Sequence, residues 1–306
     1  MATQPAVNVV IAGGSGRLGT PTIKYLLAYG FKVSVLTRDP TSLSVADGVE
    51  TIKADYSSAE SLTPCLTGRN FDVMVILLKR VHTHSQLVTM QACVNAQIPR
   101  VIPSFFGVAF DNDEDLRTPY MAPKIPILED VLDKASKGLI TYTGLNCGLF
   151  FDWSFDIHLF INLAGKPTRL YDGGEGPMSL STLDDVGRSV VGVLVKLGET
   201  KNKMLSFHSC VMTQNQVLRY AAEAAPGVEF PVEQIDSAEA IKVAWQKYNA
   251  GCNFREVMTE FAARGSFANG GGYFRETDNA LLGITQWSDE RLKEEIIQQV
   301  KRVLKC

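Results

Sequence analysis

The stretch that decides the fold lies near the N-terminus and reads Val7-Asn8-Val9-Val10-Ile11-Ala12-Gly13-Gly14-Ser15-Gly16-Arg17-Leu18-Gly19. The β-branched run from 7 to 11, interrupted only by Asn8, predicts a strand that is buried on both faces. Glycines follow at 13, 14, 16 and 19, and residues 20–28 carry apolar side chains at helical spacing. A strand, a glycine-rich turn and a helix in this order form the context in which a glycine fingerprint indicates dinucleotide binding.

The glycine positions have a physical reason if a dinucleotide binds there. A side chain at position 13 or 16 would hold the backbone away from a pyrophosphate, and Gly19 lets the helix pack close to the strand. The free N–H groups at the start of the helix would then face the phosphate anion. Both Gly14-x-Gly16-x-x-Gly19 and Gly13-x-x-Gly16-x-x-Gly19 fit, and spacing alone does not choose between them. The competing interpretation is a turn that only packs tightly.

Length and composition describe an ordinary globular protein of two units. The chain has 306 residues, of which 45% are hydrophobic and 21% charged, and this length suggests one large domain with a smaller one. The net charge of −3 and the absence of a dense basic stretch argue against a nucleic-acid partner. No run of about 18 apolar residues occurs, so a membrane span is not expected.

Cysteine and histidine usage favours a cytoplasmic protein without a metal site. The six cysteines include no CxxC pair, which is typical of reduced, structural thiols. The first residues lack the basic flank and apolar core of a signal peptide, so we expect a cytoplasmic location. The four histidines are scattered, and only His82-x-His84 offers an adventitious metal contact.

Strand and helix patterns alternate through the first half of the chain. This alternation predicts an α/β fold, a doubly wound parallel Rossmann-type sheet with a smaller C-terminal α/β substrate domain. A capping box, Ser57-x-x-Glu60, predicts a short additional helix. The expected strands cover residues 32–38, 49–55, 72–78, 100–106 and 139–146, and the expected helices cover 83–96 and 125–137.

The sequence changes in character near residue 150, where aromatic residues crowd together and turn-rich segments follow. We therefore divide the chain into a nucleotide-binding domain, 1–153, and a substrate-binding region, 154–306. Helices are expected at 183–196, 213–225, 236–247 and 254–263 and after the capping residue Ser288, and a glycine loop at 269–272.

The aromatic cluster supplies the candidate substrate contacts. Most such residues belong to a core, but some should face the cleft beyond the carboxyl ends of the strands, where ligands bind in such sheets. Phe150, Phe151 and Trp153 are the candidates, and a flat aromatic or polyketide-like substrate would suit them.

The end of the second expected strand bears on the choice of nucleotide. NAD enzymes usually carry an acidic residue there, whereas this chain has Thr37-Arg38, with Asp39 one place later. An arginine can hold a 2′-phosphate through charge-assisted hydrogen bonds, so the pattern favours NADP over NAD. Arg17 is a second candidate phosphate partner, and a solvated arginine after a strand is the alternative interpretation of Arg38.

Taken together, these motifs resemble the isoflavone reductase-like branch of the NmrA-like, atypical short-chain reductases, which includes plant phenylcoumaran benzylic ether and pinoresinol–lariciresinol reductases. They follow the family's order through the first two-thirds of the chain, and the last third matches only loosely. The segments that carry the resemblance are residues 13–19, 36–38, 100–107, 141–147, 182–187 and 279–284.

The resemblance implies NADPH as cofactor and the GxxGxxG register. It also implies that a helix within 180–198 packs back on the nucleotide domain. The positions that it assigns to the cofactor are Gly13, Ser15, Gly16, Arg17, Leu18, Gly19, Thr37, Arg38, Asp55, Leu78, Phe106 and Asn146.

One position departs from the family pattern. Plant members usually have Ser-Glu-Phe-Gly where this chain has Ser104-Phe105-Phe106-Gly107. Loss of the carboxylate predicts a more apolar floor of the site, with Phe105 as a further substrate contact. The plant substrate is therefore not carried over.

The resemblance also implies an acid–base lysine at the start of the helix before the sixth strand. Lys124 matches best, and Lys134, late in the same helix, is the alternative. Tyr120 and Lys124 also have the Tyr-x-x-x-Lys spacing of ordinary short-chain reductases, in which the phenol donates the proton and the lysine lowers the pKa of that phenol. Pro119 and Pro123 argue against a continuous helix through this pair.

From the sequence we expect a reductase that uses NADP(H) on an aromatic or otherwise apolar small molecule. The hydride acceptor would be a carbonyl, an activated double bond or a benzylic carbon. We expect a monomer or a homodimer. The alternative is an NmrA-like regulatory protein that senses a dinucleotide without catalysis.

Overall fold

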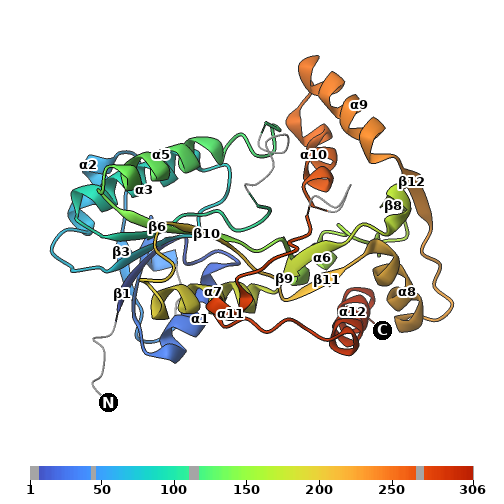
Figure 1. Cartoon of the computed structure of the whole chain (residues 1–306), viewed down its shortest axis with the longest axis horizontal. Helices are drawn as coiled ribbons and strands as arrows, with labels where there is room; N and C mark the ends of the chain where they lie inside the picture. The colour runs from blue at the N-terminus through green and yellow to red at the C-terminus, as the bar shows by residue number, and fades with distance from the viewer. Residues whose placement is uncertain (1–6, 43–45, 110–116, 267–271, 306) are drawn as a thin grey trace.

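The computed structural model of the chain describes residues 7–42, 46–109, 117–266 and 272–305. Figure 1 shows a lobe built on a central sheet beside a second lobe that contains most of the C-terminal half. Within the described ranges, no helix has the length and apolar character needed to cross a membrane.

The central sheet has seven strands, and every neighbouring pair in it is parallel. Its order is β3-β2-β1-β4-β5-β6-β10, so the chain reverses direction across the sheet between β1 and β4. This is the doubly wound order, and the predicted fold class is confirmed. The strands are β1 (Asn8–Ala12), β2 (Lys32–Thr37), β3 (Glu50–Lys53), β4 (Val73–Ile76), β5 (Arg100–Ile102), β6 (Thr141–Asn146) and β10 (Lys203–Ser206).

Helices cover both faces of this sheet because its strands are apolar on both faces. Val9 and Ile11 of β1 lie in one core cluster, and Val10 and Ala12 lie in the other. One face carries α2 (Ala59–Leu62), α3 (Thr83–Asn95) and α5 (Ile125–Ser136), and the opposite face carries α1 (Gly19–Tyr29), α7 (Leu183–Val195) and α11 (Asn279–Leu282) (Figure 1).

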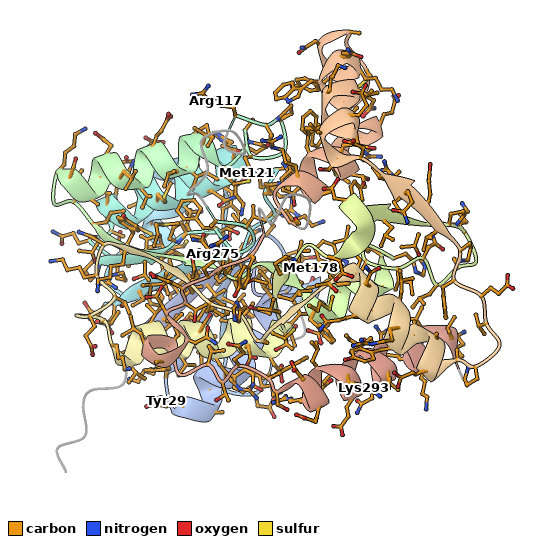
Figure 2. All side chains as sticks on the ribbon, turned by 45° about the vertical axis from the view of Figure 1, so that its right-hand side comes forward. Tyr29, Arg117, Met121, Met178, Arg275 and Lys293 are labelled. Atoms are coloured by element: carbon orange, nitrogen blue, oxygen red, sulfur yellow. The ribbon has the colours of Figure 1, made fainter. Side chains whose placement is uncertain are left out.

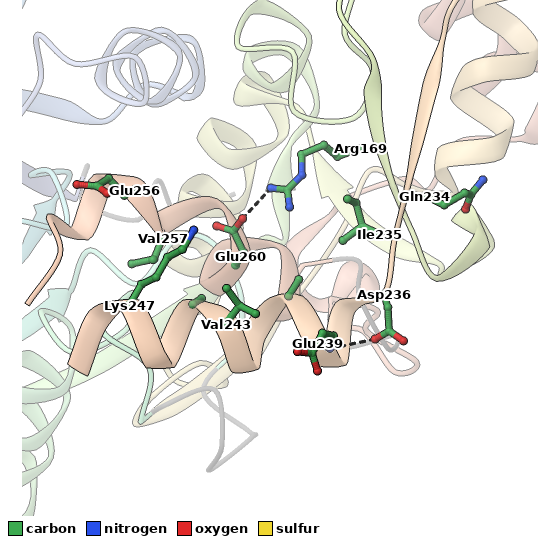
Figure 3. Close-up of a pocket in the computed structure, with 12 residues that line it drawn as sticks. Arg169, Gln234, Ile235, Asp236, Glu239, Val243, Lys247, Glu256, Val257 and Glu260 are labelled. Atoms are coloured by element: carbon green, nitrogen blue, oxygen red, sulfur yellow. Dashed lines mark hydrogen bonds and ion pairs between the residues drawn. The ribbon is translucent and has the colours of Figure 1, made fainter. Parts of the chain in front are cut away.

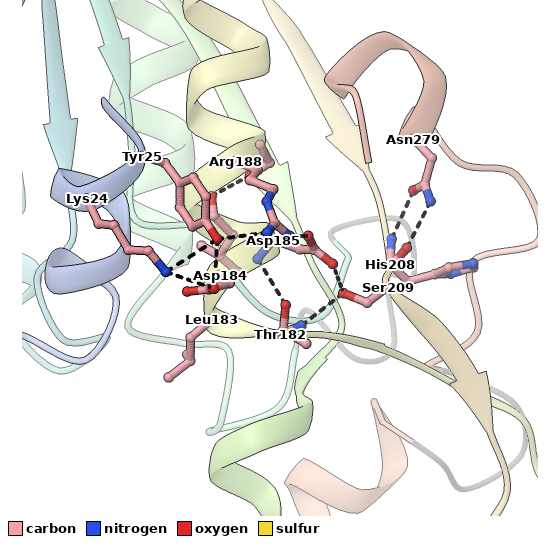
Figure 4. A network of polar contacts seen from close by, with 12 residues as sticks. Lys24, Tyr25, Thr182, Leu183, Asp184, Asp185, Arg188, His208, Ser209 and Asn279 are labelled. Carbon is pink, nitrogen blue, oxygen red and sulfur yellow. Dashed lines mark hydrogen bonds and ion pairs between the residues drawn. The ribbon is translucent and has the colours of Figure 1, made fainter. Parts of the chain in front are cut away.

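Helix α7 comes from the second half of the sequence and packs directly on α1. A Cβ atom on Gly187 would lie 2.7 Å from the carbonyl oxygen of Pro21, so only glycine permits this approach. Polar contacts hold the same pair of helices (Figure 4): the Tyr25 hydroxyl donates to Asp184 at 2.7 Å, and Arg188 donates to that hydroxyl at 2.8 Å. The sheet lobe therefore includes a helix from beyond residue 180.

The second lobe is built on two small sheets and a separate aromatic core, in which Phe151 packs edge-on against Phe155 and Trp287. One sheet joins β7 (Leu149–Phe150), β9 (Met178–Ser181) and β11 (Cys210–Met212), and the other joins β8 (Thr168–Tyr171) and β12 (Val232–Ile235). Its helices are α6 (Phe151–Asp156), α8 (Gln214–Ala224), α9 (Ser237–Asn249), α10 (Met258–Arg264) and α12 (Asp289–Leu304).

Several predicted boundaries were wrong for local reasons. Strand β5 ends at Ile102 rather than at residue 106, because Pro103 offers no N–H to continue the ladder. The cap of α2 is Ser58, which accepts from the Ser61 N–H, and not Ser57. The helix expected at 254–263 is divided into a 3₁₀ turn, Phe254–Glu256, and α10. Most of the expected glycine loop, residues 269–271, lies outside the described residues.

A buried arginine joins the sheet to the segment after α7. Arg100 is 6% exposed, and its donors reach the Thr141 hydroxyl at 2.7 Å, the Thr143 hydroxyl at 2.9 Å and the Leu197 carbonyl oxygen at 2.8 Å. These acceptors are neutral, so hydrogen bonds alone compensate for the buried charge.

We predict that Arg100→Met lowers the free energy of unfolding by about 2–4 kcal/mol, because it leaves buried acceptors without donors. Arg69→Met, which removes a partly exposed ion pair with Glu50, is the control and should change it by less than about 1 kcal/mol. Urea denaturation of both variants measures the difference. Equal losses would show that Arg100 has no special structural role.

Candidate functional site

The glycine turn joins β1 to α1 at the carboxyl edge of the sheet, and each of its glycines meets different atoms. Gly13 has a φ of +95°, and an added Cβ would lie 2.8 Å from the backbone of Leu77. A Cβ on Gly19 would lie 2.1 Å from the Gly14 carbonyl oxygen. At Gly16, by contrast, an added Cβ would meet only the Gly13 carbonyl oxygen, at 3.3 Å. The protein's own packing thus requires Gly13 and Gly19, whereas Gly16 is exposed on the open side of the turn.

The start of α1 is built to attract an anion. Its N-cap, Leu18, has no side-chain cap, and its first turn contains no acidic residue. The hydrogen bonds within the described residues include none from the N–H groups of Arg17 and Leu18 to a protein acceptor. Ser15 is exposed beside them. Free N–H groups and the positive end of the helix dipole favour an anion here, where the sequence predicts a pyrophosphate cradle.

Arg38 follows β2 and is exposed, and no ion pair within the described residues uses it. Its charge lies close enough to the half-buried Tyr56 to oppose the rise in the pKa of that phenol that burial causes. Thr37 accepts a hydrogen bond from the Asp39 N–H at 3.3 Å, and Asp55 accepts one from the Ser57 N–H at 2.9 Å. The loops after β2 and β3 are therefore ordered by their own polar side chains, and the Arg38 guanidinium remains available to a ligand.

Arg17 points from the glycine turn toward α6 in the second lobe. Its guanidinium lies 3.3 Å from Asp156 and 5.5 Å from the ring centroid of Trp153. Asp156 also pairs with Arg302 of α12, at 2.7 Å. The rings of Phe150 and Trp153 are 5.9 Å apart. These contacts bring the half-buried members of the aromatic cluster to the edge of the glycine turn.

Lys124 is the N-cap residue of α5, and its ammonium is buried against the end of β5. The Nζ atom donates to the carbonyl oxygens of Phe105 and Phe106, at 3.1 Å each. The pKa of Lys124 is lowered to about 8, mainly by burial; the Cys147 thiol opposes this shift, and the charge of Arg80 adds to it. An ammonium with this pKa can donate or hold a proton near neutral pH.

Tyr120 lies in a series of turns, because α5 begins only at Ile125. Its ring packs against the small core that α9 and α10 share, and its carbonyl oxygen accepts a short hydrogen bond from Arg80. Figure 2 shows the neighbouring Met121 near the base of α10. The Tyr-x-x-x-Lys pair therefore does not share one helix, as the flanking prolines indicate.

Of the other predicted site residues, some lie at the carboxyl edge of the sheet and others lie in the hydrophobic core. Asn146 is buried at the end of β6; its Nδ2 donates to Ser206 at 3.3 Å, and its Oδ1 has no hydrogen-bond partner among the described residues. The Leu78 carbonyl oxygen accepts from the Ser104 hydroxyl at 2.8 Å. Phe105 and Phe151 are fully buried, each in a different core cluster.

Two further residues that the sequence singled out, Lys134 and Phe106, are also buried. Lys134 pairs with Asp130 one helical turn away, on the buried side of α5, and so lies away from the carboxyl edge of the sheet. The Phe106 side chain is 7% exposed and belongs to the core cluster under α1 and α7.

Arg80 is the residue that sequence reasoning missed. It lies just after β4, which together with β1 forms the point where the strand order reverses, and its guanidinium is 4.4 Å from the Tyr120 ring centroid. The sequence feature that could have revealed it is a basic residue in the loop that follows a buried strand at the reversal of strand order, where ligands bind in such sheets.

A cavity of about 340 Å³ opens elsewhere, in the second lobe (Figure 3). It lies between α9, α10 and the strand pair β8–β12, and the ion pair between Arg169 and Glu260, 2.8 Å, crosses its wall. None of the residues predicted for the site lines it. Among the described residues, no group of three His, Cys, Asp or Glu side chains could hold a metal ion.

Curated relatives and solved structures match nearly the whole chain. The protein named oxidoreductase poxI, from Penicillium oxalicum, is 26% identical over 299 residues, which cover 94% of this chain and 93% of that protein. A crystal structure from the work on pinoresinol-lariciresinol and phenylcoumaran benzylic ether reductases has a TM-score of 0.74 at 18% identity, covering 95% of this chain and 100% of that one.

A further similar structure is the binary complex of leucoanthocyanidin reductase with NADPH from Vitis vinifera. Its TM-score is 0.73 at 16% identity, with 95% of this chain and 99% of that chain covered. The model of the NmrA-like family matches residues 5–268. The glycine turn, the order of the strands and this match have one explanation: the chain belongs to the NmrA-like family.

Proposed function

We propose that the protein is an NADPH-dependent reductase of the isoflavone reductase-like type, acting on an aromatic or otherwise apolar small molecule. One observation carries the proposal: the pyrophosphate cradle at Gly16 and the buried ammonium of Lys124 lie at the same carboxyl edge of one parallel sheet. The oxidoreductase relative and the NADPH complex of a similar fold support it.

Each part of the edge has a separate task in this proposal. The N–H groups after Gly16 hold the pyrophosphate, and Arg38 holds the 2′-phosphate. The Oδ1 of Asn146, which has no hydrogen-bond partner within the described residues, is available to the rest of the cofactor, and the Leu78 backbone lies at the same edge. When bound, NADPH supplies a hydride to an electrophilic carbon of the substrate.

Lys124 then acts on the oxygen that gains negative charge. Its bonds to the backbone carbonyl oxygens of Phe105 and Phe106 fix the ammonium at this edge, where it donates a proton to that oxygen. Tyr120 is the alternative donor, but its ring packs on α9 and α10 rather than on Lys124. We therefore assign the proton to Lys124.

We predict that Gly16→Val abolishes NADPH binding, because the branched side chain occupies the space that the pyrophosphate needs. Gly198→Val is the matched control, since a Cβ there meets nothing within 4 Å. Calorimetric titration with NADPH separates the two variants. A folded Gly16→Val protein with normal affinity would place the phosphates elsewhere.

Arg38→Ala should weaken NADPH binding by the free energy of one charge-assisted contact, about 1.5–3 kcal/mol. NADH, which lacks the 2′-phosphate, should bind the variant and the wild type alike. The dissociation constants of NADPH and NADH, measured for both proteins, show whether Arg38 contacts the 2′-phosphate. Equal losses for both cofactors would assign Arg38 a structural role instead.

Lys124→Met should lower kcat by about 10²–10⁴-fold on an aromatic ketone, with NADPH affinity largely retained. Tyr120→Phe should leave kcat nearly unchanged. Because the pKa of Lys124 is lowered to about 8, the donor is protonated below that pH and lost above it. The kcat of the wild type should thus fall as pH rises through about 8.

Steady-state kinetics between pH 6 and 10 (about two units either side of the Lys124 pKa) test this assignment. If Tyr120→Phe is inactive while Lys124→Met retains activity, the proton comes from the phenol. Tight NADPH binding without turnover on any aromatic ketone or enone would instead indicate a dinucleotide-sensing regulator.

A further inference from the structure

Arg80 stands at the junction of the two lobes. It lies in the loop between β4 and α3, and its guanidinium carbon is 4.4 Å from the Tyr120 ring centroid and 5.8 Å from that of Phe254. Its Nη1 donates to the carbonyl oxygen of Tyr120. The two aromatic rings and this bond fix the orientation of the planar group.

The same contacts place Arg80 beside the site of Lys124. The Thr83 hydroxyl, at the start of α3, donates to the Pro123 carbonyl oxygen at 2.8 Å. Together with the bond from Arg80 to Tyr120, it joins the segment after β4 to residues 120–124 at two points. The Lys124 N–H in turn bonds to the Met121 carbonyl oxygen at 2.8 Å. The segment that carries Arg80 and the segment that carries Lys124 are therefore held together by hydrogen bonds at the carboxyl edge of the sheet.

Arg80 differs from Arg100 and Arg169 in the acceptors that its guanidinium N–H groups find in the protein. Arg100 uses donors on all three of its guanidinium nitrogens, and Arg169 pairs with Glu260. Arg80 is half-buried, yet the bonds of the described residues engage only its Nη1, and no carboxylate among them pairs with it. A partly desolvated guanidinium with free donors is matched to a planar anion.

We propose that Arg80 binds a carboxylate of the substrate, so that the substrate is an aromatic carboxylic acid whose reacting carbon lies toward Lys124. This inference rests on the proposed function and adds the substrate class to it. The alternative is that Arg80 only attaches α9 and α10 to the first lobe.

The test compares two aromatic ketones that differ in one charge, 4-acetylbenzoate and methyl 4-acetylbenzoate. Each is titrated by calorimetry into the full chain with saturating NADP⁺. We expect Arg80→Met to weaken binding of the acid at least tenfold and to leave the ester within twofold. Arg80→Lys should lie between, because an ammonium lacks the bidentate geometry. Arg255→Met, which removes an exposed arginine next to Phe254, should change neither ligand.

Three results would overturn the inference. The acid could bind wild type and Arg80→Met equally, both ligands could weaken together with a lowered Tm, or NADP⁺ affinity could fall instead. The proposed function fails separately. If the acid binds in an Arg80-dependent way but NADPH is not oxidised, the carboxylate site stands and the reductase proposal fails. If neutral ketones are reduced equally well by wild type and Arg80→Met and the acid binds both equally, the reductase proposal stands and the carboxylate site fails.

Discussion

The structure depends on one backbone contact, the approach of the start of α1 to the end of β1. Gly19 lies so close to the Gly14 carbonyl that even a methyl group would reach within 2.1 Å of it. This contact directs the positive end of α1 at the point where the strand order reverses, which makes it an anion site. A second close approach, Gly187 against Pro21, lets α7 lie on α1, so a helix from the second half of the chain completes the first lobe.

The second lobe meets this edge through charged and aromatic side chains rather than through a continuous core. Arg17 reaches Asp156 and Trp153 on one side of the edge, and Arg80 reaches Tyr120 and Phe254 on the other. Between them, backbone carbonyls hold Lys124, whose buried ammonium has a pKa lowered to about 8. Three cationic groups therefore lie along this edge, which suits the proposed reaction, in which the substrate gains negative charge.

The sequence predicts the sheet lobe well because its signals are local. Buried β-branched runs and the glycine turn each determine their own neighbourhood, and the structure confirms both at β1 and the start of α1. The short strands β7 to β12 escape such reasoning, because two to four residues show no periodicity. The environment of Lys124 and the position of Arg80 also escape it, because both depend on loops brought together by the folded sheet.

We propose that a dinucleotide lies across the carboxyl edge between β1 and β4 with its reactive ring toward Lys124. A crystal structure of the full chain with NADP⁺ tests this most directly. We predict the pyrophosphate above Gly16, within hydrogen-bond distance of the N–H groups of Arg17 and Leu18, and the nicotinamide on the side of Lys124. A nicotinamide directed away from Lys124, or NADP⁺ bound instead in the cavity between α9 and α10, would show that Lys124 does not serve the cofactor site.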